Sequence, residues 1–364
     1  MLNGRDRQLR QITWDAYSQL SLPDKAPYLN NGRRPYHVLL AQQFDRQTLD
    51  ELGMLATSIR RIAKSKAGMQ FLQDLLCHKR AMLYFTQPSS RTFLSFYAAC
   101  QIIGLSPAEV RDSATSSEMK GEAPEDTLRT FSSYFDLLVM RTPKPGFAER
   151  IAWLLSNTER PVPIINAGSG KDQHPTQALL DIYTLQRSFE HLGGIENKNV
   201  VFVGDLGRGR TVRSLSCLLT LYPGVKQYFV APSELQIGQD VLDQLDAADV
   251  DYEVSYDFEN VIPETDAIYM TRLQDEWDKG ENDATKSDNS QYFLKPEHLD
   301  KMKNTAVIMH PLPRRDEIDS RIDVDPRAVY WRQVRNGMWI RVALMASIFG
   351  KVADEIFNFY ELNM

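Results

Sequence analysis

The sequence predicts an α/β protein of two domains, each a mainly parallel β-sheet flanked by helices. Short apolar runs that end in polar residues recur along the chain, and stretches of helical periodicity separate them, as in parallel sheets. A length of 364 residues suits two domains. Ligands of such sheets bind beyond the carboxyl ends of the strands, so the polar residues after each run are the candidate site.

Five segments are predicted to be strands, and helices are expected between them. Apolar residues at helical spacing over 44–76 cover a core, and 91–103 forms a helix that Gly104 can end. A final helix is expected to begin near Met338, and the polar, mostly acidic stretch 275–291 is expected to be a mobile loop. The predicted strands are 81–85, 135–141, 199–206, 267–273 and 305–315.

Composition indicates a globular protein of the cytoplasm. Hydrophobic residues make up 43% and charged residues 25%, and the apolar runs are too short to cross a bilayer. A formal net charge of -6 gives no general affinity for nucleic acid or anionic membranes. The cysteines Cys77, Cys100 and Cys217 form neither a disulfide framework nor a metal-ligand pattern, which fits a reducing compartment. Residues 1–36 have no signal-peptide pattern and are expected to be a short extension ending in a loop.

The segment PSSRT contains the first candidate site residues, Ser89, Ser90, Arg91 and Thr92. It lies between a predicted strand and a predicted helix, where hydroxyls, backbone N–H groups and a guanidinium can converge on a phosphate. The same serines would also serve as an ordinary helix N-cap. This segment alone leaves both interpretations open.

A second segment, QHPTQ, places His174 and Gln177 three residues apart at the start of a helix. Residues at this spacing share one helix face, so an imidazole and an amide could point into the same cleft. A histidine on its own is more often structural. The glycine-rich loop before His174 and the nearby Gln177 favour a functional role.

Three arginines follow predicted strands: Arg141, Arg210 and Arg272, with Gln274 two residues after the last. Arginine binds carboxylate or phosphate with two parallel hydrogen bonds, so the set indicates anionic substrates, although each arginine alone could lie on the surface. The segment GDLGRGR lacks the full spacing of a dinucleotide-binding loop, so no nicotinamide cofactor is expected.

The segment HPLP follows the last predicted strand and contains Pro311, Leu312 and Pro313. The prolines hold backbone carbonyl groups in fixed directions without the usual sheet partners. Such carbonyls can accept hydrogen bonds from an NH2 group, and the alternative is a rigid turn.

The motifs of this sequence, taken in order, resemble those of the transcarbamoylase family, and within it those of the aspartate carbamoyltransferase catalytic chains. These motifs are SSRT, MKGE, VMRTP, NAG followed by QHPTQ, GDLGRGRTV, MTRLQ and HPLPR. The resemblance covers residues 36 to 350. It implies a carbamoyl phosphate-binding domain (37–175, completed by a C-terminal helix, 338–364) and an aspartate-binding domain (176–337). It also implies an active site in the cleft between the domains and at the interface between subunits of a homotrimer, with no metal or organic cofactor.

The resemblance also assigns roles to the candidate residues. The phosphate would be held by Ser89, Ser90, Arg91, Thr92 and Arg141. The expected catalytic residues are Arg91, Thr92, Arg141 and His174, of which the last three would polarise the carbamoyl carbonyl. The carbamoyl NH2 group would meet Gln177 and the carbonyls of Pro311 and Leu312, aspartate would be bound by Arg210, Arg272, Gln274 and Lys120, and a neighbouring subunit would supply Ser116 and Lys120.

The sequence departs from the family pattern near these motifs. Gln87 replaces a glutamate that takes part in domain closure, Phe93 replaces an arginine, and Trp277 replaces an arginine after MTRLQ. Ser90 and Met119 replace a threonine and a lysine. The leading expectation is aspartate carbamoyltransferase activity in pyrimidine biosynthesis. The alternatives are a transcarbamoylase for another amino acid and a non-catalytic carbamoyl phosphate-binding paralogue or assembly subunit.

Overall fold

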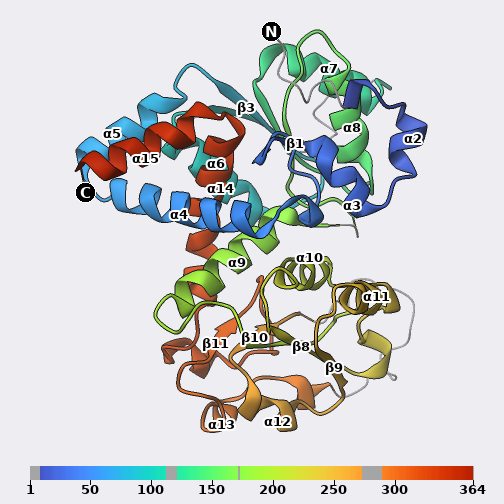
Figure 1. Cartoon of the computed structure of the whole chain (residues 1–364), viewed down its shortest axis with the longest axis vertical. Coiled ribbons are helices and arrows are strands. Elements are labelled where there is room, and N and C mark those ends of the chain that lie inside the picture. The colour runs from blue at the N-terminus through green and yellow to red at the C-terminus, as the bar shows by residue number, and fades with distance from the viewer. Residues whose placement is uncertain (1–8, 112–120, 171–172, 273–288, 364) are drawn as a thin grey trace. The chain divides into compact units, whose positions relative to one another are not determined.

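The computed structural model describes residues 9–111, 121–170, 173–272 and 289–363, and the chain divides into two compact units (Figure 1). Unit 1 comprises Met1–Leu180 and Asn336–Met364, and unit 2 comprises Asp181–Arg335. Each unit contains one larger parallel sheet flanked by helices, which confirms the predicted fold class. Helices α9 (Pro175–Phe189) and α14 (Tyr330–Ile348) carry the chain from one unit into the other.

Unit 1 is built on four parallel strands in the order β4-β3-β5-β6. Every residue of β5 is buried, which is typical of a parallel strand covered on both faces. The strands are β3 (Arg80–Phe85), β4 (Ser106–Val110), β5 (Leu137–Arg141) and β6 (Ile164–Asn166), and the helices are α4 (Arg46–Ile62), α5 (Lys66–Leu75), α6 (Ser90–Ile102), α7 (Pro124–Tyr134), α8 (Phe147–Ser156) and α15 (Lys351–Asn363).

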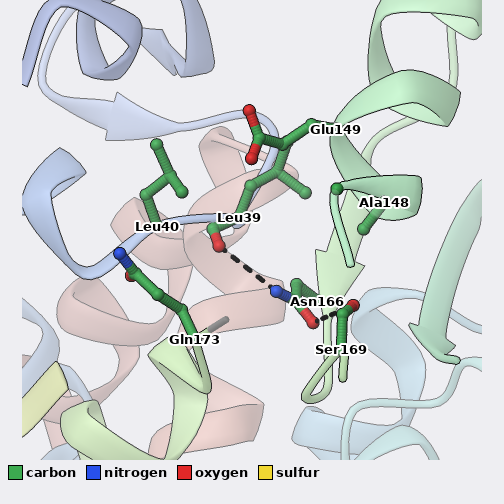
Figure 2. A pocket seen from close by; sticks show the side chains of 8 residues that line it. Leu39, Leu40, Ala148, Glu149, Asn166, Ser169 and Gln173 are labelled. Carbon is green, nitrogen blue, oxygen red and sulfur yellow. Dashed lines mark hydrogen bonds between the residues drawn. The ribbon is translucent and has the colours of Figure 1, made fainter. Parts of the chain in front are cut away.

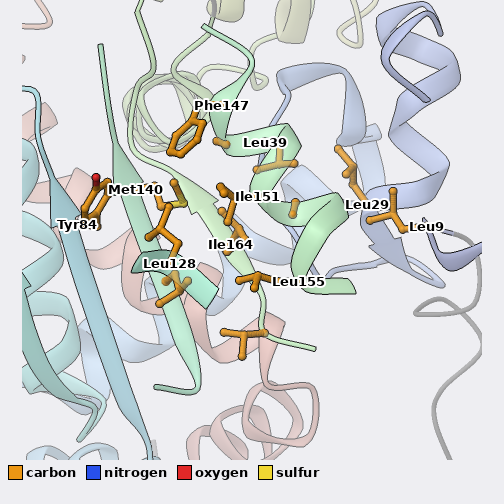
Figure 3. Close-up of a cluster of buried hydrophobic side chains, with 14 of the residues drawn as sticks. Leu9, Leu29, Leu39, Tyr84, Leu128, Met140, Phe147, Ile151, Leu155 and Ile164 are labelled. Atoms are coloured by element: carbon orange, nitrogen blue, oxygen red, sulfur yellow. The ribbon is translucent and has the colours of Figure 1, made fainter. Parts of the chain in front are cut away.

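The described part of the N-terminal segment packs on the core of unit 1. Leu9, Tyr17 and Leu29 are almost fully buried and belong to one apolar cluster with side chains of β5, β6 and α8 (Figure 3). A salt bridge of 2.9 Å between Lys25 and Glu149 also ties this segment to α8. Tyr17, Lys25 and Leu29 lie within residues 1–36, so this segment contributes to the stability of unit 1.

The expectation of a loop before residue 36 was therefore wrong. The segment contains α2 (Trp14–Ser18), α3 (Leu22–Lys25), the 3-10 helix η1 (Ala26–Leu29) and a hairpin of β1 (Asn30–Asn31) and β2 (Arg34–Pro35). Pro23 and Pro27 lie in the first turns of α3 and η1, where a missing N–H costs nothing, and Pro35 lies in β2.

Unit 2 is built on five parallel strands in the order β11-β10-β7-β8-β9. One apolar cluster contains side chains from four of these strands and from the segments around them. The strands are β7 (Asn199–Val203), β8 (Lys226–Val230), β9 (Tyr252–Ser255), β10 (Ala267–Met270) and β11 (Val307–Met309), and the helices include α10 (Arg210–Leu219), α11 (Gln239–Ala247), α12 (Phe258–Val261) and α13 (Pro296–Leu299).

Each of the five predicted strand segments contains a strand, but the other four strands of the two parallel sheets, β4, β6, β8 and β9, and the short hairpin β1–β2 were not predicted. The predicted helix over 44–76 is two helices, α4 and α5, because the chain turns at 63–65. Helix α6 ends before Gly104, whose φ of +81° is accessible to glycine, as predicted. The final helix was expected near Met338, but α14 begins at Tyr330 and α15 follows it. Within the described residues, no helix combines the length and apolar character needed to cross a membrane.

A buried histidine of unit 1 makes the stability of the protein pH-dependent. Ile164 N–H donates to His37 Nδ1 at 3.2 Å, so Nε2 carries the proton that faces Ser156 Oγ at 3.0 Å. Burial lowers the pKa of His37 from 6.5 to about 3. Between these pH values the unfolded chain binds a proton that the folded chain does not bind. The free energy of unfolding therefore falls as the pH falls through this range, by about 1.4 kcal/mol per pH unit.

We predict that His37→Asn removes this part of the pH dependence, while it lowers stability at neutral pH. The measurement is urea unfolding at several pH values between 4 and 7, with His78→Asn, at an exposed position, as the control. Equal pH slopes for His37→Asn and the unchanged protein would contradict the assignment.

Candidate active site

The segment PSSRT connects β3 to α6. Ser89 occupies the N-cap position of α6, but its side chain makes no capping hydrogen bond, so the capping alternative does not account for its hydroxyl. Ser90 and Arg91 are exposed in the first turn of this helix, and Thr92 is buried. The first N–H groups of a helix have no partners within the helix and attract anions. The structure thus places hydroxyls and a guanidinium at the N-terminus of a helix, where an anion could be bound.

Arg141 is the last residue of β5 and lies beside this segment. Its residue partner across the sheet is Phe85, the last residue of β3, and its carbonyl accepts a hydrogen bond of 3.2 Å from Gln87 N–H. Its side chain is buried, and Nη1 donates to the carbonyl of Ala167 at 3.0 Å. A buried guanidinium requires polar or anionic partners, which makes Arg141 the strongest candidate for an anion-binding residue in unit 1.

The loop after β6 is held by Asn166 (Figure 2). Its Oδ1 accepts hydrogen bonds from Gly168 N–H at 2.8 Å and from Ser169 Oγ at 3.0 Å, and its Nδ2 donates to Leu39 O at 3.3 Å. Gly170 N–H donates to Thr142 O, next to Arg141, at 3.0 Å. These bonds hold the loop at the same edge of the sheet as Arg141.

His174 and Gln177 lie at the start of α9. The carbonyl of His174 accepts hydrogen bonds from the N–H groups of Gln177 at 2.9 Å and Ala178 at 3.2 Å, so His174 is in the N-cap position. The preceding residue, Gln173, is anchored because its Oε1 accepts a bond of 2.7 Å from Ala41 N–H. Both side chains of the pair are buried, at 4% and 8% exposure, and their first-turn placement agrees with the spacing in the sequence.

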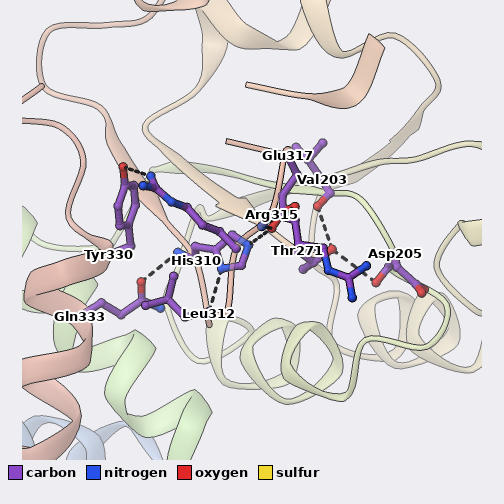
Figure 4. Close-up of polar contacts among 10 residues, drawn as sticks. Val203, Asp205, Thr271, His310, Leu312, Arg315, Glu317, Tyr330 and Gln333 are labelled. Carbon is purple, nitrogen blue, oxygen red and sulfur yellow. Dashed lines mark hydrogen bonds and ion pairs between the residues drawn. The ribbon is translucent and has the colours of Figure 1, made fainter. Parts of the chain in front are cut away.

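In unit 2 the loop after β7 and the residue after β10 lie at one edge of the sheet. Val203 and Met270, the last residues of these strands, are paired, and Thr271 donates to Val203 O through N–H at 2.8 Å and through Oγ1 at 2.9 Å (Figure 4). Arg272 follows Thr271 directly. Arg210 is the first residue of α10, which the loop after β7 joins to that strand. Both arginines therefore follow the carboxyl ends of adjacent strands.

The segment HPLP follows β11 at the same edge of the sheet. Leu312 has a φ of +55° and precedes a cis peptide bond to Pro313. Leu312 N–H donates to His310 Nδ1 at 2.7 Å, and His310 Nε2 lies 2.7 Å from Glu317 Oε1 (Figure 4). Burial acts to raise the pKa of Glu317, but hydrogen bonds from His310 and backbone N–H groups lower it overall. Sequence reasoning missed His310 and Glu317, because no spacing rule identifies a pair of this kind.

The substitutions at Gln87 and Phe93 have different surroundings. The side-chain Oε1 of Gln87 is buried and has no hydrogen-bond partner among the described residues. Phe93 is buried, contacts the ring of Phe85 with centroids 5.5 Å apart, and has the guanidinium of Arg111 at 4.5 Å from its ring centroid. An arginine from another segment therefore lies against the side chain that replaces the family's arginine. The predicted residues Ser116, Met119, Lys120, Gln274 and Trp277 lie outside the described residues, as do residues 275–288 of the loop predicted over 275–291. Its last residues lie in the 3-10 helix η9 (Ser290–Tyr292).

The predicted residues that the structure describes are divided between the two units. The unit 1 group contains the segment from Ser89 to Thr92 with Arg141, His174 and Gln177, and the unit 2 group contains Arg210, Arg272, Pro311 and Leu312. Both groups follow the carboxyl ends of parallel strands and are rich in groups that bind anions. Among the described residues, no cluster of three or more His, Cys, Asp or Glu side chains could hold a metal ion.

Comparison with protein-family models gives a match over most of the chain. Residues 36–187 match the aspartate/ornithine carbamoyltransferase carbamoyl-P binding domain, and residues 196–348 match the Asp/Orn binding domain of the same family. The chain belongs to the aspartate/ornithine carbamoyltransferase family. This agrees with the resemblance seen in the motifs.

Relatives within the carbamoyltransferase family include plant and bacterial proteins. The chain is 42% identical over 327 residues to the chloroplastic aspartate carbamoyltransferase 1 of Pisum sativum, covering 88% of this chain and 81% of the relative. It is 44% identical over 280 residues to an aspartate carbamoyltransferase catalytic subunit of Vibrio cholerae, covering 76% and 87%. The structure resembles aspartate transcarbamoylase from Trypanosoma cruzi in complex with carbamoyl phosphate and aspartate, with a TM-score of 0.75, 35% identity and coverage of 87% and 97%.

Gly204 is required for the loop that leads to Arg210. Its φ is +112°, and a Cβ there would lie 2.5 Å from Thr271 O and 2.6 Å from Thr271 Oγ1. We predict that Gly204→Ala lowers the free energy of unfolding by about 3 kcal/mol or more, because backbone strain and a clash with main-chain atoms add together.

The matched control is Gly193→Ala, where φ is +83° but no atom of the described part of the chain contacts the added Cβ within 4 Å. That change should cost about 1 kcal/mol, from backbone strain alone. Thermal and urea unfolding measure both values. Equal losses in the two variants would show that contact with Thr271 does not constrain the loop.

Proposed function

We propose that this protein is an aspartate carbamoyltransferase, which transfers the carbamoyl group of carbamoyl phosphate to the amino group of L-aspartate. The products would be N-carbamoyl-L-aspartate and phosphate, in the pathway of pyrimidine biosynthesis. The observation that carries the proposal is the buried Arg141 beside the Ser89–Thr92 helix terminus, in a chain whose two halves match the two domain models of the family. The motifs MTRLQ and HPLPR favour aspartate as the acceptor.

Carbamoyl phosphate is proposed to be anchored by its phosphate group. The hydroxyls of Ser89, Ser90 and Thr92 and the N–H groups at the start of α6 would donate hydrogen bonds to the phosphate oxygens. Arg91 and Arg141 would supply positive charge, and Arg141 is already held in place by Ala167 O. Burial of Arg141 strengthens its interaction with an anion, because little water competes.

The carbamoyl group is proposed to be held at both ends. Thr92, Arg141 and His174 would donate hydrogen bonds to its carbonyl oxygen, and Gln177 with the carbonyls of Pro311 and Leu312 would accept from its NH2 group. The first set polarises the carbonyl and stabilises the negative charge that forms on its oxygen during attack. The second set orients the group.

Aspartate is proposed to bind through its two carboxylates. Arg210, Arg272 and Gln274 would hold them, and Lys120 with Ser116 would come from a neighbouring subunit. A site shared in this way requires an oligomer, and the family resemblance implies a homotrimer, which sedimentation of the purified protein tests. The three cysteines, none in a disulfide, support a cytoplasmic location, although the pea relative is named as chloroplastic.

The proposed reaction has two steps, attack by the amine and loss of phosphate. The amino nitrogen of aspartate attacks the carbamoyl carbon and gives a tetrahedral intermediate with a negatively charged oxygen. The bond from carbon to the phosphate oxygen breaks, phosphate leaves, and a phosphate oxygen takes the proton released by the amine. Much of the acceleration would come from holding two mutually repelling anions together and orienting the amine.

The test is a steady-state assay of phosphate and N-carbamoyl-aspartate over wide ranges of both substrates. We expect equal amounts of the two products. Arg91→Ala and His174→Ala should each lower kcat/KM by about 100-fold or more, as loss of a group that stabilises the transition state does. Arg272→Ala should raise KM for aspartate more than KM for carbamoyl phosphate. Arg187→Ala is the control that should change neither value, because the side chain of Arg187 is partly exposed and pairs with Glu190, just after the end of α9.

Two results would contradict this function. Turnover with a different amino acid in preference to aspartate would indicate a transcarbamoylase for that acceptor. Tight binding of carbamoyl phosphate by the folded protein without turnover of any acceptor would indicate a binding paralogue or an assembly subunit.

A further inference from the structure

His310 is a buried residue of unit 2 to which the proposed reaction assigns no role. It follows β11 and is 1% exposed, and it contacts two buried polar residues, Glu317 and Gln333. Burying a polar group lowers the stability of the fold unless the group makes hydrogen bonds. The pattern of these bonds shows what His310 holds in place.

The ring of His310 has one accepting and one donating nitrogen. Leu312 N–H donates to Nδ1 at 2.7 Å, so Nδ1 carries no proton. The ring proton is therefore on Nε2, which donates to Glu317 Oε1 at 2.7 Å. Glu317 is itself held by Arg315 N–H, which lies 3.0 Å from each of its carboxylate oxygens. Glu317 thus selects the ring form that can accept from Leu312.

The main chain of His310 is held independently of its ring. Its N–H donates to Gln333 Oε1 at 2.9 Å, and Gln333 Nε2 donates to Asp181 Oδ1 at 2.7 Å. The other oxygen of Asp181 accepts from Tyr269 Oη at 2.8 Å. All of these residues belong to unit 2, and Asp181 and Gln333 are almost fully buried. The ring therefore meets Leu312 from a backbone position that is itself fixed.

The bond from Leu312 N–H sets the direction of the Pro311 carbonyl. The Pro311–Leu312 peptide is trans, since the cis bond lies between Leu312 and Pro313. In a planar trans peptide the C=O points opposite to the N–H. Because the N–H of Leu312 points at the ring of His310, the C=O of Pro311 points away from it. The same bond supports Leu312 in the left-handed conformation that side chains rarely adopt.

We propose that His310 is a positioning residue that aims the Pro311 carbonyl at the NH2 group of the carbamoyl donor, with Glu317 selecting the ring form that does so. This inference rests on the proposed function, which makes that carbonyl a ligand of the NH2 group. It extends the site to residues that touch no substrate. It also predicts that His310 affects recognition of the amide end of the donor and leaves recognition of the phosphate end unchanged.

Two substitutions of His310 separate the roles of its ring nitrogens. Asn places its side-chain oxygen where Nδ1 lies and keeps an acceptor for Leu312 N–H. Gln reaches the position of Nε2 and keeps a donor for Glu317, but it has no acceptor at the Nδ1 position. The matched control is His298→Gln, because His298 is also buried, accepts from the N–H of Lys295 at 3.1 Å and faces Glu259 at 3.2 Å, but lies in α13.

The measurement is calorimetric binding of phosphonoacetamide, a stable phosphonate that carries an amide, and of inorganic phosphate. We expect His310→Gln to weaken phosphonoacetamide binding about tenfold, as loss of one well-placed hydrogen bond does, and to leave phosphate binding unchanged. His310→Asn should recover most of this loss, and His298→Gln should match the unchanged protein for both ligands. If His310→Gln does not fold, Glu317→Leu carries the test, because it removes the oxygen that accepts from Nε2 of His310, and it should show the same ligand-selective loss.

The inference is overturned if His310→Gln weakens both ligands equally, if it weakens neither, or if Asn and Gln behave alike. It is also overturned if the unchanged protein binds phosphonoacetamide no better than phosphate. None of these binding results depends on turnover. Failure of the proposed function would instead appear as a lack of N-carbamoyl-aspartate formation by the unchanged protein.

Discussion

Parallel pairing of the strands is the constraint on which both groups of site residues depend. In a parallel sheet the carboxyl ends of adjacent strands meet at one edge, so loops that are far apart in sequence become neighbours. The pairing of Phe85 with Arg141 brings the segment PSSRT beside Arg141 in unit 1. The pairing of Met270 with Val203 does the same for the residues before Arg272 and the loop of Arg210 in unit 2. A shift of register in either sheet would separate these groups.

The electrostatics of the site follow from this arrangement. Positive charge that is buried is costly to leave without partners, and Arg141 is oriented by the Ala167 carbonyl before any ligand arrives. Preorganised charge of this kind interacts strongly with an incoming anion, because the guanidinium is already oriented when the ligand binds. In the proposed role of His310, a neutral group, the carbonyl of Pro311, is likewise oriented before the ligand binds. There a buried ring directs a backbone carbonyl, and no side chain near the substrate is needed for that purpose.

Sequence reasoning found the strands that end in chemically informative residues and missed those that do not. The residues of β4 are all exposed or half-buried, and β6 is only three residues long, so neither has a strong apolar pattern. Strand β8 contains the buried polar residue Gln227, whose Nε2 donates to Ser216 O at 3.1 Å. The N-terminal segment was misjudged because its Pro and Gly content suggested a loop, whereas its buried apolar residues decide its packing. The pair of His310 and Glu317 depends on tertiary geometry that no local pattern records.

In the proposed reaction, the arginines of both units act on one pair of anionic substrates. N-(phosphonacetyl)-L-aspartic acid, which is bound in one of the similar Trypanosoma cruzi structures, joins a phosphonate and two carboxylates in one molecule. Its binding to the purified protein by calorimetry is the most direct test. We expect one bound molecule per chain, with an affinity that falls at least 100-fold in Arg141→Ala and in Arg272→Ala taken separately, since each substitution removes a charged partner of the ligand. Full affinity in either variant would contradict the claim.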